Sequence, residues 1–156
     1  MNNDILRFEF FKRHREYGAV FLRVLIGSFI IYGVQDNILS YARMEEFTRF
    51  LEARHVPFPL FAAFLSAYTQ FACGVCILLG AFVRWASIPF IINFIAAIII
   101  AHLGDPFERM FPALVMLFTG FFFLFHGAGK LSVDEWRERR EGREAAGQTQ
   151  TAAING

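Results

Sequence analysis

The sequence predicts an all-α integral membrane protein, a four-helix bundle with a short interfacial amphipathic helix between helices one and two. Four stretches are apolar and close to the roughly 20 residues that a membrane-spanning helix needs. Hydrophobic residues make up 56% of the 156 positions, 21 of them phenylalanine, and the mean hydropathy is +0.43. A soluble domain of this length has too little polar surface to cover so much apolar area.

A charged segment precedes the first predicted span. Residues 1–16 are charged and basic, and the first apolar stretch runs from about 17 to 34. It ends in Gln35, Asp36 and Asn37 rather than in a small-residue cleavage site, so we expect a retained helix and not a signal peptide. The other three spans are expected at about 58–82, 85–103 and 107–125.

The connection 37–57 is long enough for an element of its own. Its apolar residues recur at helical spacing with charges between them: Met44, Phe47, Phe50 and Leu51. This pattern predicts a short helix on the outer membrane surface. Pro57 and Pro59 end it and suit the start of the next span, because a proline disfavours helix in the residue before it and is tolerated in a first helical turn.

Charge predicts the orientation and the domain limits. Lys and Arg concentrate before the first span, in the turn at Arg84 and after the fourth span, so we expect both termini in the cytoplasm. We divide the chain into a basic cytoplasmic lead-in (1–16), a four-helix membrane domain (17–134) and a cytoplasmic tail (135–156). The tail is expected to be charged and then disordered from about Gly142, where Gly, Ala, Gln, Thr and Asn dominate.

Polar side chains inside the predicted spans are the candidate functional residues, because a polar group without a partner is penalised in lipid. They are Arg23, Ser66, Gln70, Asn93, Thr119 and His126. On helix two, Ser66 and Gln70 share a stripe of small residues that should face the bundle. Gln70, Asn93 and Thr119 near mid-membrane either hydrogen-bond between helices or line a ligand site.

Arg23 has two possible orientations. Its guanidinium either stretches back to the membrane interface or points into the bundle as a fixed positive charge. In the second case it would suit an anionic ligand, a quinone carbonyl or an acidic partner.

Other motifs give little support for chemistry within this chain alone. Cys73 and Cys76 have redox spacing but lie inside an apolar helix, so we interpret them as packing residues. His102 and His126 end helices at opposite faces, where the helix dipole accounts for them, and no spacing predicts a metal site. There is no nucleotide-binding motif, and a net charge of +1 argues against nucleic acid. The sequence assigns no catalytic residue.

The ordered part of the chain, from about Phe21 to Asp134, resembles the DoxX family of small bacterial membrane proteins. The resemblance rests on Arg23-Val-Leu-Ile-Gly27 with Gly33, Val56-Pro57, Gln70-Phe-Ala-Cys-Gly74, Ile77-Leu-Leu-Gly80 with Arg84, and Gly127-Ala-Gly129-Lys-Leu-Ser132-Val-Asp134. It implies a four-helix bundle in the bacterial inner membrane and a link to redox chemistry. Relatives include the DoxD subunit of thiosulfate:quinone oxidoreductase, which reduces quinone. The sequence departs from the family where Gln70 replaces a usual glutamate and Asp36 a frequent lysine, and an amide cannot titrate.

Three functions follow as hypotheses. The first is a membrane subunit of a redox complex that interacts with quinone or quinol, with Arg23, Gln70 and Asn93 lining the pocket. The protein would then be a quinone-linked oxidoreductase subunit without metal or nucleotide. The second is a non-catalytic membrane anchor or assembly subunit, and the third is a small transporter. Beyond the lipid bilayer, the expected partner is another subunit or a second copy of the chain.

Overall fold

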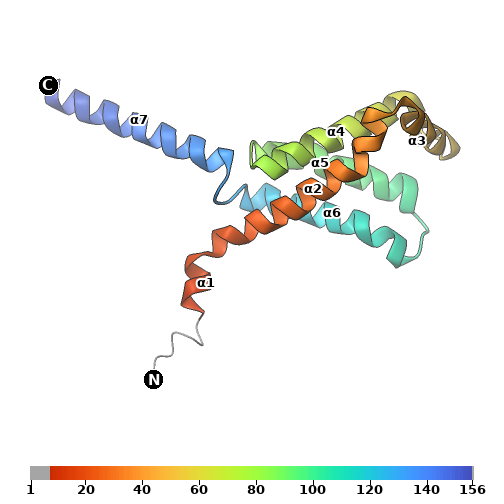
Figure 1. Cartoon of the computed structure of the whole chain (residues 1–156), viewed down its shortest axis with the longest axis horizontal. Helices are drawn as coiled ribbons and strands as arrows, with labels where there is room; N and C mark the ends of the chain where they lie inside the picture. The colour runs from red at the N-terminus through yellow and green to blue at the C-terminus, as the bar shows by residue number, and fades with distance from the viewer. Residues whose placement is uncertain (1–7, 156) are drawn as a thin grey trace.

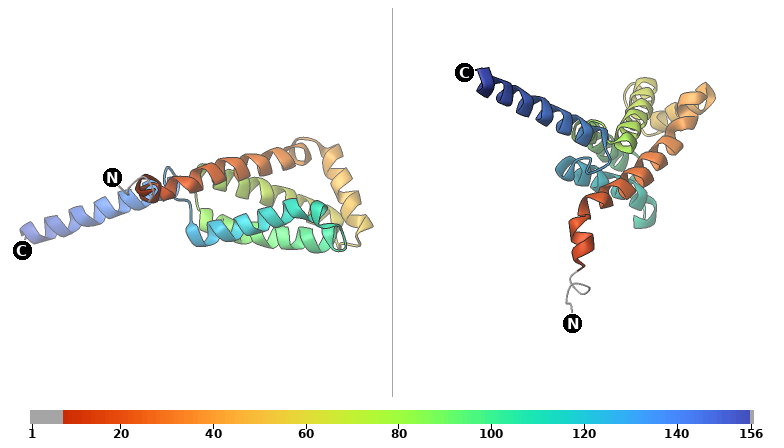
Figure 2. Two further views of the ribbon diagram at one scale, coloured as in Figure 1. Left: turned by 90° about the horizontal axis from the view of Figure 1, so that it is seen from below. Right: turned by 60° about the vertical axis from the view of Figure 1, so that its left-hand side comes forward.

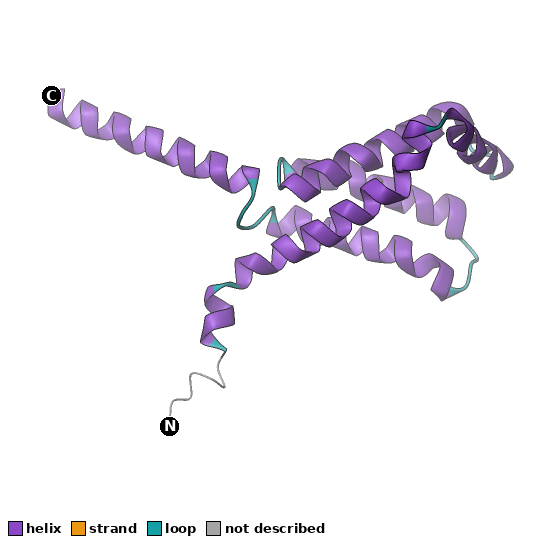
Figure 3. Ribbon diagram, in the orientation of Figure 1, coloured by secondary structure: helices purple, strands orange, loops and turns teal. Residues whose placement is uncertain are grey.

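The structure, a computed structural model, describes residues 8–155, and every element in that part of the chain is helical (Figure 3). The elements, in chain order, are α1 (Glu9–Arg13), the 3-10 turn η1 (Arg15–Tyr17), α2 (Gly18–Leu39), α3 (Tyr41–Ala53), α4 (Pro59–Leu79), α5 (Val83–Ala97), the π-helical turn η2 (Ile98–His102), α6 (Phe107–His126) and α7 (Val133–Asn155).

Four helices among the described residues are long and apolar enough to cross a membrane: Arg15–Leu39, Pro59–Leu79, Val83–His102 and Phe107–His126. They confirm the predicted all-α membrane bundle and its contact with lipid. The first helix continues five residues beyond the expected end at Val34. Its polar residues Gln35, Asp36 and Asn37 extend the helix without needing a place in the hydrocarbon.

The four spans pack in chain order, α2 against α4, α4 against α5 and α5 against α6 (Figures 1 and 2). Glycine allows a close approach between α2 and α4. A Cβ on Gly27 would lie 2.8 Å from Leu78 Cβ and 3.0 Å from Gly74 O. Small residues bring helices together in lipid, where no hydrophobic force does so. Leu78 of α4 packs directly on Gly27.

The predicted surface helix is confirmed as α3. It lies across one end of the bundle, as the left view of Figure 2 shows. Met44 is 1% exposed and packs with Leu51 against Ala63 and Ala67 of α4. The apolar stripe therefore faces the ends of the spans, and α3 covers them. Pro59 is the first residue of α4, as predicted.

Both ends of the described chain leave the bundle on the side opposite α3 (Figure 1). Here the structure differs from the expected disorder after Gly142, because α7 continues as one helix to Asn155. Two pairs at i,i+4 spacing support its first half, Arg139 with Glu135 at 2.7 Å and Arg140 with Glu144 at 3.1 Å. Such exposed pairs add a few tenths of a kcal/mol, about what an isolated helix gains from them.

Candidate functional site: a cavity at mid-membrane

A cavity of about 620 Å³ lies between the four spans and beneath α3. It begins near the middle of α4 and α5 and extends to the end of the bundle that α3 covers. Its walls are mostly aliphatic and aromatic side chains from α2, α4, α5 and α6, while Phe47, Phe50 and Leu51 of α3 close the outer end. A volume of this size accommodates a small organic ligand.

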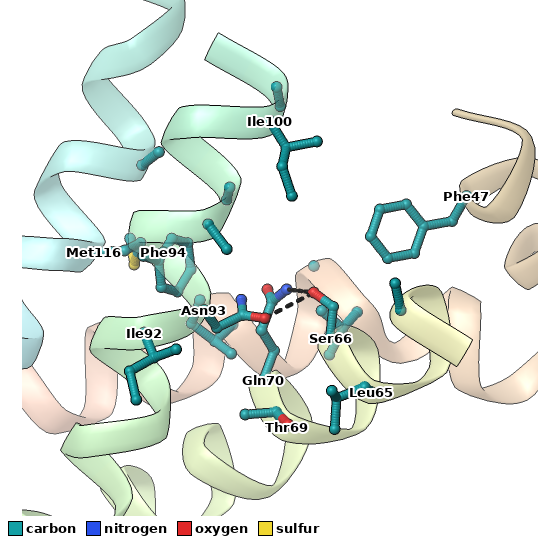
Figure 4. A pocket seen from close by; sticks show the side chains of 18 of the residues that line it. Phe47, Leu65, Ser66, Thr69, Gln70, Ile92, Asn93, Phe94, Ile100 and Met116 are labelled. Atoms are coloured by element: carbon teal, nitrogen blue, oxygen red, sulfur yellow. Dashed lines mark hydrogen bonds between the residues drawn. The ribbon is translucent and has the colours of Figure 1, made fainter. Parts of the chain in front are cut away.

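Three polar side chains meet on one wall of this cavity (Figure 4). Ser66 Oγ donates a hydrogen bond to Asn93 Oδ1 at 2.9 Å, and Gln70 Nε2 donates to Ser66 Oγ at 3.1 Å. The amide nitrogen of Asn93 is buried and has no hydrogen-bond partner within the described part of the chain. We call these three residues the Asn93 cluster. One strong donor of the cluster is therefore unsatisfied by the described residues.

Helix geometry explains why these residues meet. Ser66 and Gln70 are four apart on α4 and therefore lie on one face, one turn from each other. Asn93 is near the middle of the third span, which runs antiparallel to α4 and packs directly against it. All three are thus at mid-membrane depth, where water does not compete for their hydrogen bonds.

His102 is the one titratable side chain among the described residues that line the cavity. Its Nδ1 lies 3.2 Å from Asp105 Oδ2, at the end covered by α3. It closes η2, whose carbonyls at Ile100 and Ala101 accept hydrogen bonds from Arg54 at 3.1 and 3.0 Å. Single π-helical turns inside α-helices occur frequently at functional sites.

Arg23 turns inward, but it does not line this cavity. Its side chain is 3% exposed and reaches the loop after α6. Nη1 donates to Ala128 O at 2.8 Å and to Lys130 O at 3.2 Å, and Nη2 donates to Leu131 O at 2.9 Å. Nε is buried without a partner among residues 8–155. The guanidinium thus joins the first span to the end of the fourth.

The structure therefore brings Gln70 and Asn93 together and leaves Arg23 apart. Arg23 lies level with Gly80, since a Cβ there would be 2.8 Å from Arg23 Cζ. At about 1.5 Å per residue, Gln70 is about 15 Å farther along α4. The expectation that all three share one pocket does not fit this register of α2 against α4.

Gly80 and Asp134 complete the surroundings of Arg23, and we call this group the Arg23 cluster. Gly80 ends α4 with a φ of +68° and its carbonyl accepts from Asp134 N at 3.0 Å. The Asp134 carboxylate accepts from Phe82 N at 2.7 Å and Val83 N at 3.0 Å. A carboxylate at these orphan N–H groups caps the start of α5.

The remaining candidates lie outside the cavity. Cys73 is buried where α4 meets α5, with its Sγ 3.2 Å from Ala86 O, and neither cysteine lines the cavity. Thr119 donates to Val115 O of its own helix at 2.7 Å. His126 Nε2 lies 3.8 Å from Glu16 Oε2, at the end where the termini leave.

Some cavity features had no clear signal in the sequence. Ser66 stands out as polar, but its role as a bridge between Gln70 and Asn93 depends on the α4–α5 register. His102 reads as the last residue of a span, and the π-helical turn that brings it to the cavity leaves no recognisable pattern. The covering role of Phe47 and Phe50 follows only once α3 is placed on the bundle.

The DoxX family model matches residues 18–103, which is more than half of the chain. The match runs from α2 through η2 and includes both the Asn93 cluster and Arg23. No curated protein and no solved structure matches the chain. On the extent of the family match, this multi-pass membrane protein belongs to the DoxX family.

Proposed function

We propose that this DoxX protein is the membrane subunit of a redox complex and that its cavity binds the head group of a quinone or quinol. The observation that carries the proposal is the buried amide nitrogen of Asn93, which has no hydrogen-bond partner among residues 8–155 and belongs to a side chain on the wall of an apolar cavity at mid-membrane depth. A quinone carbonyl is an acceptor that reaches this depth, because quinones dissolve in the bilayer.

The cavity fits such a ligand in both size and chemistry. Its lining is largely apolar, as a ring with methyl or methoxy substituents requires, and its polar side chains lie near Asn93, apart from His102 at the end covered by α3. Asn93 would donate to the carbonyl oxygen, while the hydrogen bond from Ser66 holds the amide in position. An ordered donor loses little entropy when it binds, which favours recognition.

The lining also supports a role as a subunit rather than a complete enzyme. It contains neither Cys73 nor Cys76, so the electrons would come from a partner protein. Among the described residues that line it there is no carboxylate, and Gln70 cannot titrate. Protons would reach the bound ligand from His102 and Asp105 at the covered end, or the ligand would exchange them directly with water. These residues would bind and orient the ligand, and the partner would supply or accept the electrons.

Binding to purified protein tests the proposal. Full-length protein in detergent is titrated with ubiquinone, and Asn93→Leu is compared with Thr119→Val. The control removes a mid-membrane polar group that bonds only to its own helix. Loss of one buried hydrogen bond to the ligand should make Asn93→Leu bind ubiquinone about tenfold more weakly, equivalent to about 1.4 kcal/mol. Thr119→Val should bind it within about twofold of the unaltered protein. Unchanged binding by Asn93→Leu would remove Asn93 from the site.

A second candidate function, a non-catalytic anchor, is favoured by α7. This helix extends away from the bundle in Figure 1, and its side chains from Arg137 to Ala146 are exposed. It would hold a soluble partner at the membrane. Isolation of the protein from native membranes separates the two functions, because an anchor would bring a companion protein and no quinone.

We also propose a bacterial inner-membrane location with both termini in the cytoplasm. Both ends lie on one side of the bundle, as the even number of spans requires. Arg84, Lys130 and the arginines of α7 lie at that end and support a cytoplasmic assignment by the positive-inside rule. A reporter fused after Asp134 should behave as cytoplasmic, and periplasmic activity of this fusion would reverse the orientation.

A further inference from the structure

We infer that the cavity opens sideways into the bilayer between α4 and α5 and that this opening holds the apolar tail of the ligand. The inference rests on the proposed function, since it takes the ligand to be a quinone. It extends recognition from the head group to the apolar tail of the ligand, and it identifies the path by which the ligand enters the cavity.

Exposed side chains among the cavity lining mark the opening. Leu65 of α4 and Ile92 of α5 both line the cavity, yet they are 56% and 62% exposed. Thr69 and Pro89 line it beside them. We call these four residues the mouth. Leu65 and Ile92 lie near the middle of their spans, so their exposed surface faces lipid tails rather than water.

The mouth lies at the same depth as the Asn93 cluster. Leu65, Thr69 and Ile92 directly precede Ser66, Gln70 and Asn93 in the sequence. Adjacent residues of a helix differ in height by about 1.5 Å, and their side chains point about 100° apart. Figure 4 shows Leu65, Thr69 and Ile92 beside the three polar residues. A head group bonded to Asn93 would therefore direct a ring substituent toward the lipid.

The aqueous end of the cavity is covered, which leaves the sideways path. α3 places Phe47, Phe50 and Leu51 over the cavity, and Arg54 fastens the segment after α3 to the carbonyls of η2. Pro89 presents a compact ring at the mouth and has no N–H to bond in its helix. Phe29 of α2 also lines the cavity and is 53% exposed, so a path beside α2 is the competing route.

Two quinone probes and a set of tryptophan variants test the inference. Full-length protein in phosphatidylcholine vesicles is titrated with ubiquinone carrying a long isoprenoid tail and with its tailless head group. Ile92→Trp and Leu65→Trp fill the mouth. Ile95→Trp is the matched control, because Ile95 is on the same helix and 41% exposed but does not line the cavity. Phe29→Trp narrows the competing route.

The mouth variants should bind the long-tailed probe about tenfold more weakly and the tailless head group as the unaltered protein does, while Ile95→Trp changes neither. The inference is overturned if the mouth variants bind the long-tailed probe normally, or if Phe29→Trp alone weakens it. It is also overturned if the tail adds no affinity to the unaltered protein, and in that case the proposed function stands. Failure of the unaltered protein to bind either probe would instead refute the proposed function.

Discussion

The Arg23 cluster and the Asn93 cluster each contain a polar side chain from a membrane-spanning helix, and they differ in what surrounds that side chain. The Arg23 cluster is closed: three carbonyls from the loop after α6 accept from one guanidinium, and protein packs around it. The Asn93 cluster is open: Asn93 lines a cavity, and its amide nitrogen has no hydrogen-bond partner among residues 8–155. Arg23 Nε also lacks a partner among these residues, but Arg23 does not line the cavity. Both look alike in the sequence, as polar residues in apolar helices. Their partners indicate a structural role for the first and a binding role for the second.

Replacement of Arg23 should have the largest effect, and it should be an effect on stability. Arg23→Ala removes every hydrogen bond between the first span and the loop after α6 that the guanidinium makes. We expect a loss of about 3 kcal/mol, because the buried Ala128 carbonyl and the part-buried carbonyls of Lys130 and Leu131 all lose their donor. Thermal unfolding of the protein in detergent measures it.

Arg23→Lys is the companion variant, and it should recover only part of the stability, since an ammonium cannot span three carbonyls with a planar fork. The comparison between the clusters fails if Arg23→Ala unfolds normally and loses quinone binding instead.

The second-largest loss of stability is expected for Gly80→Ala. The backbone at Gly80 has a φ of +68°, which costs a residue with a Cβ about 1 kcal/mol or more. The added Cβ would also lie 2.6 Å from Ser132 Cβ and 2.8 Å from Arg23 Nη1. We expect about 2 kcal/mol of destabilisation by the same unfolding measurement. Gly18→Ala is the control, because a Cβ there meets nothing within 4 Å. Equal stability of the two variants would show that Gly80 is not part of a closed cluster.

Asn93→Leu should separate the two regions most directly. It should weaken quinone binding while lowering the free energy of unfolding by only about 1 kcal/mol. The amide nitrogen that it removes has no partner among residues 8–155, so the loss is that of the Ser66 hydrogen bond to the amide oxygen. Unfolding of Asn93→Leu and Arg23→Ala is measured side by side. A large loss of stability in Asn93→Leu would make the Asn93 cluster a structural element as well.

The smallest effect is expected for the double variant Cys73→Ala with Cys76→Ala. Both thiols are free and neither lines the cavity, so only packing volume and one weak contact with Ala86 O are lost. We expect less than about 1 kcal/mol and quinone binding within twofold of the unaltered protein. Loss of electron transfer in this variant at normal membrane levels would give the two thiols a redox role.

The helices could be predicted from the sequence because each depends on local pattern. Long apolar runs gave the spans, and the spacing of Met44, Phe47 and Leu51 gave α3. The positions of Gln70 and Asn93 on inward faces followed from the same periodicity. The place of Arg23 could not be predicted, because it depends on the register of α2 against α4 and on carbonyls that every residue possesses. Backbone acceptors leave no trace in a side-chain pattern.

The closing of the Arg23 cluster also sets an order of events during synthesis. Arg23 enters the membrane with the first span, but its farthest acceptor, Leu131, follows it by 108 residues. Until the fourth span has been made, the guanidinium has none of the three carbonyls, and a charge at that depth is unfavourable in lipid. The first span must therefore wait near the interface or beside the insertion machinery. The end of the bundle that holds both termini is assembled last, and a chain that stops before residue 128 never completes it.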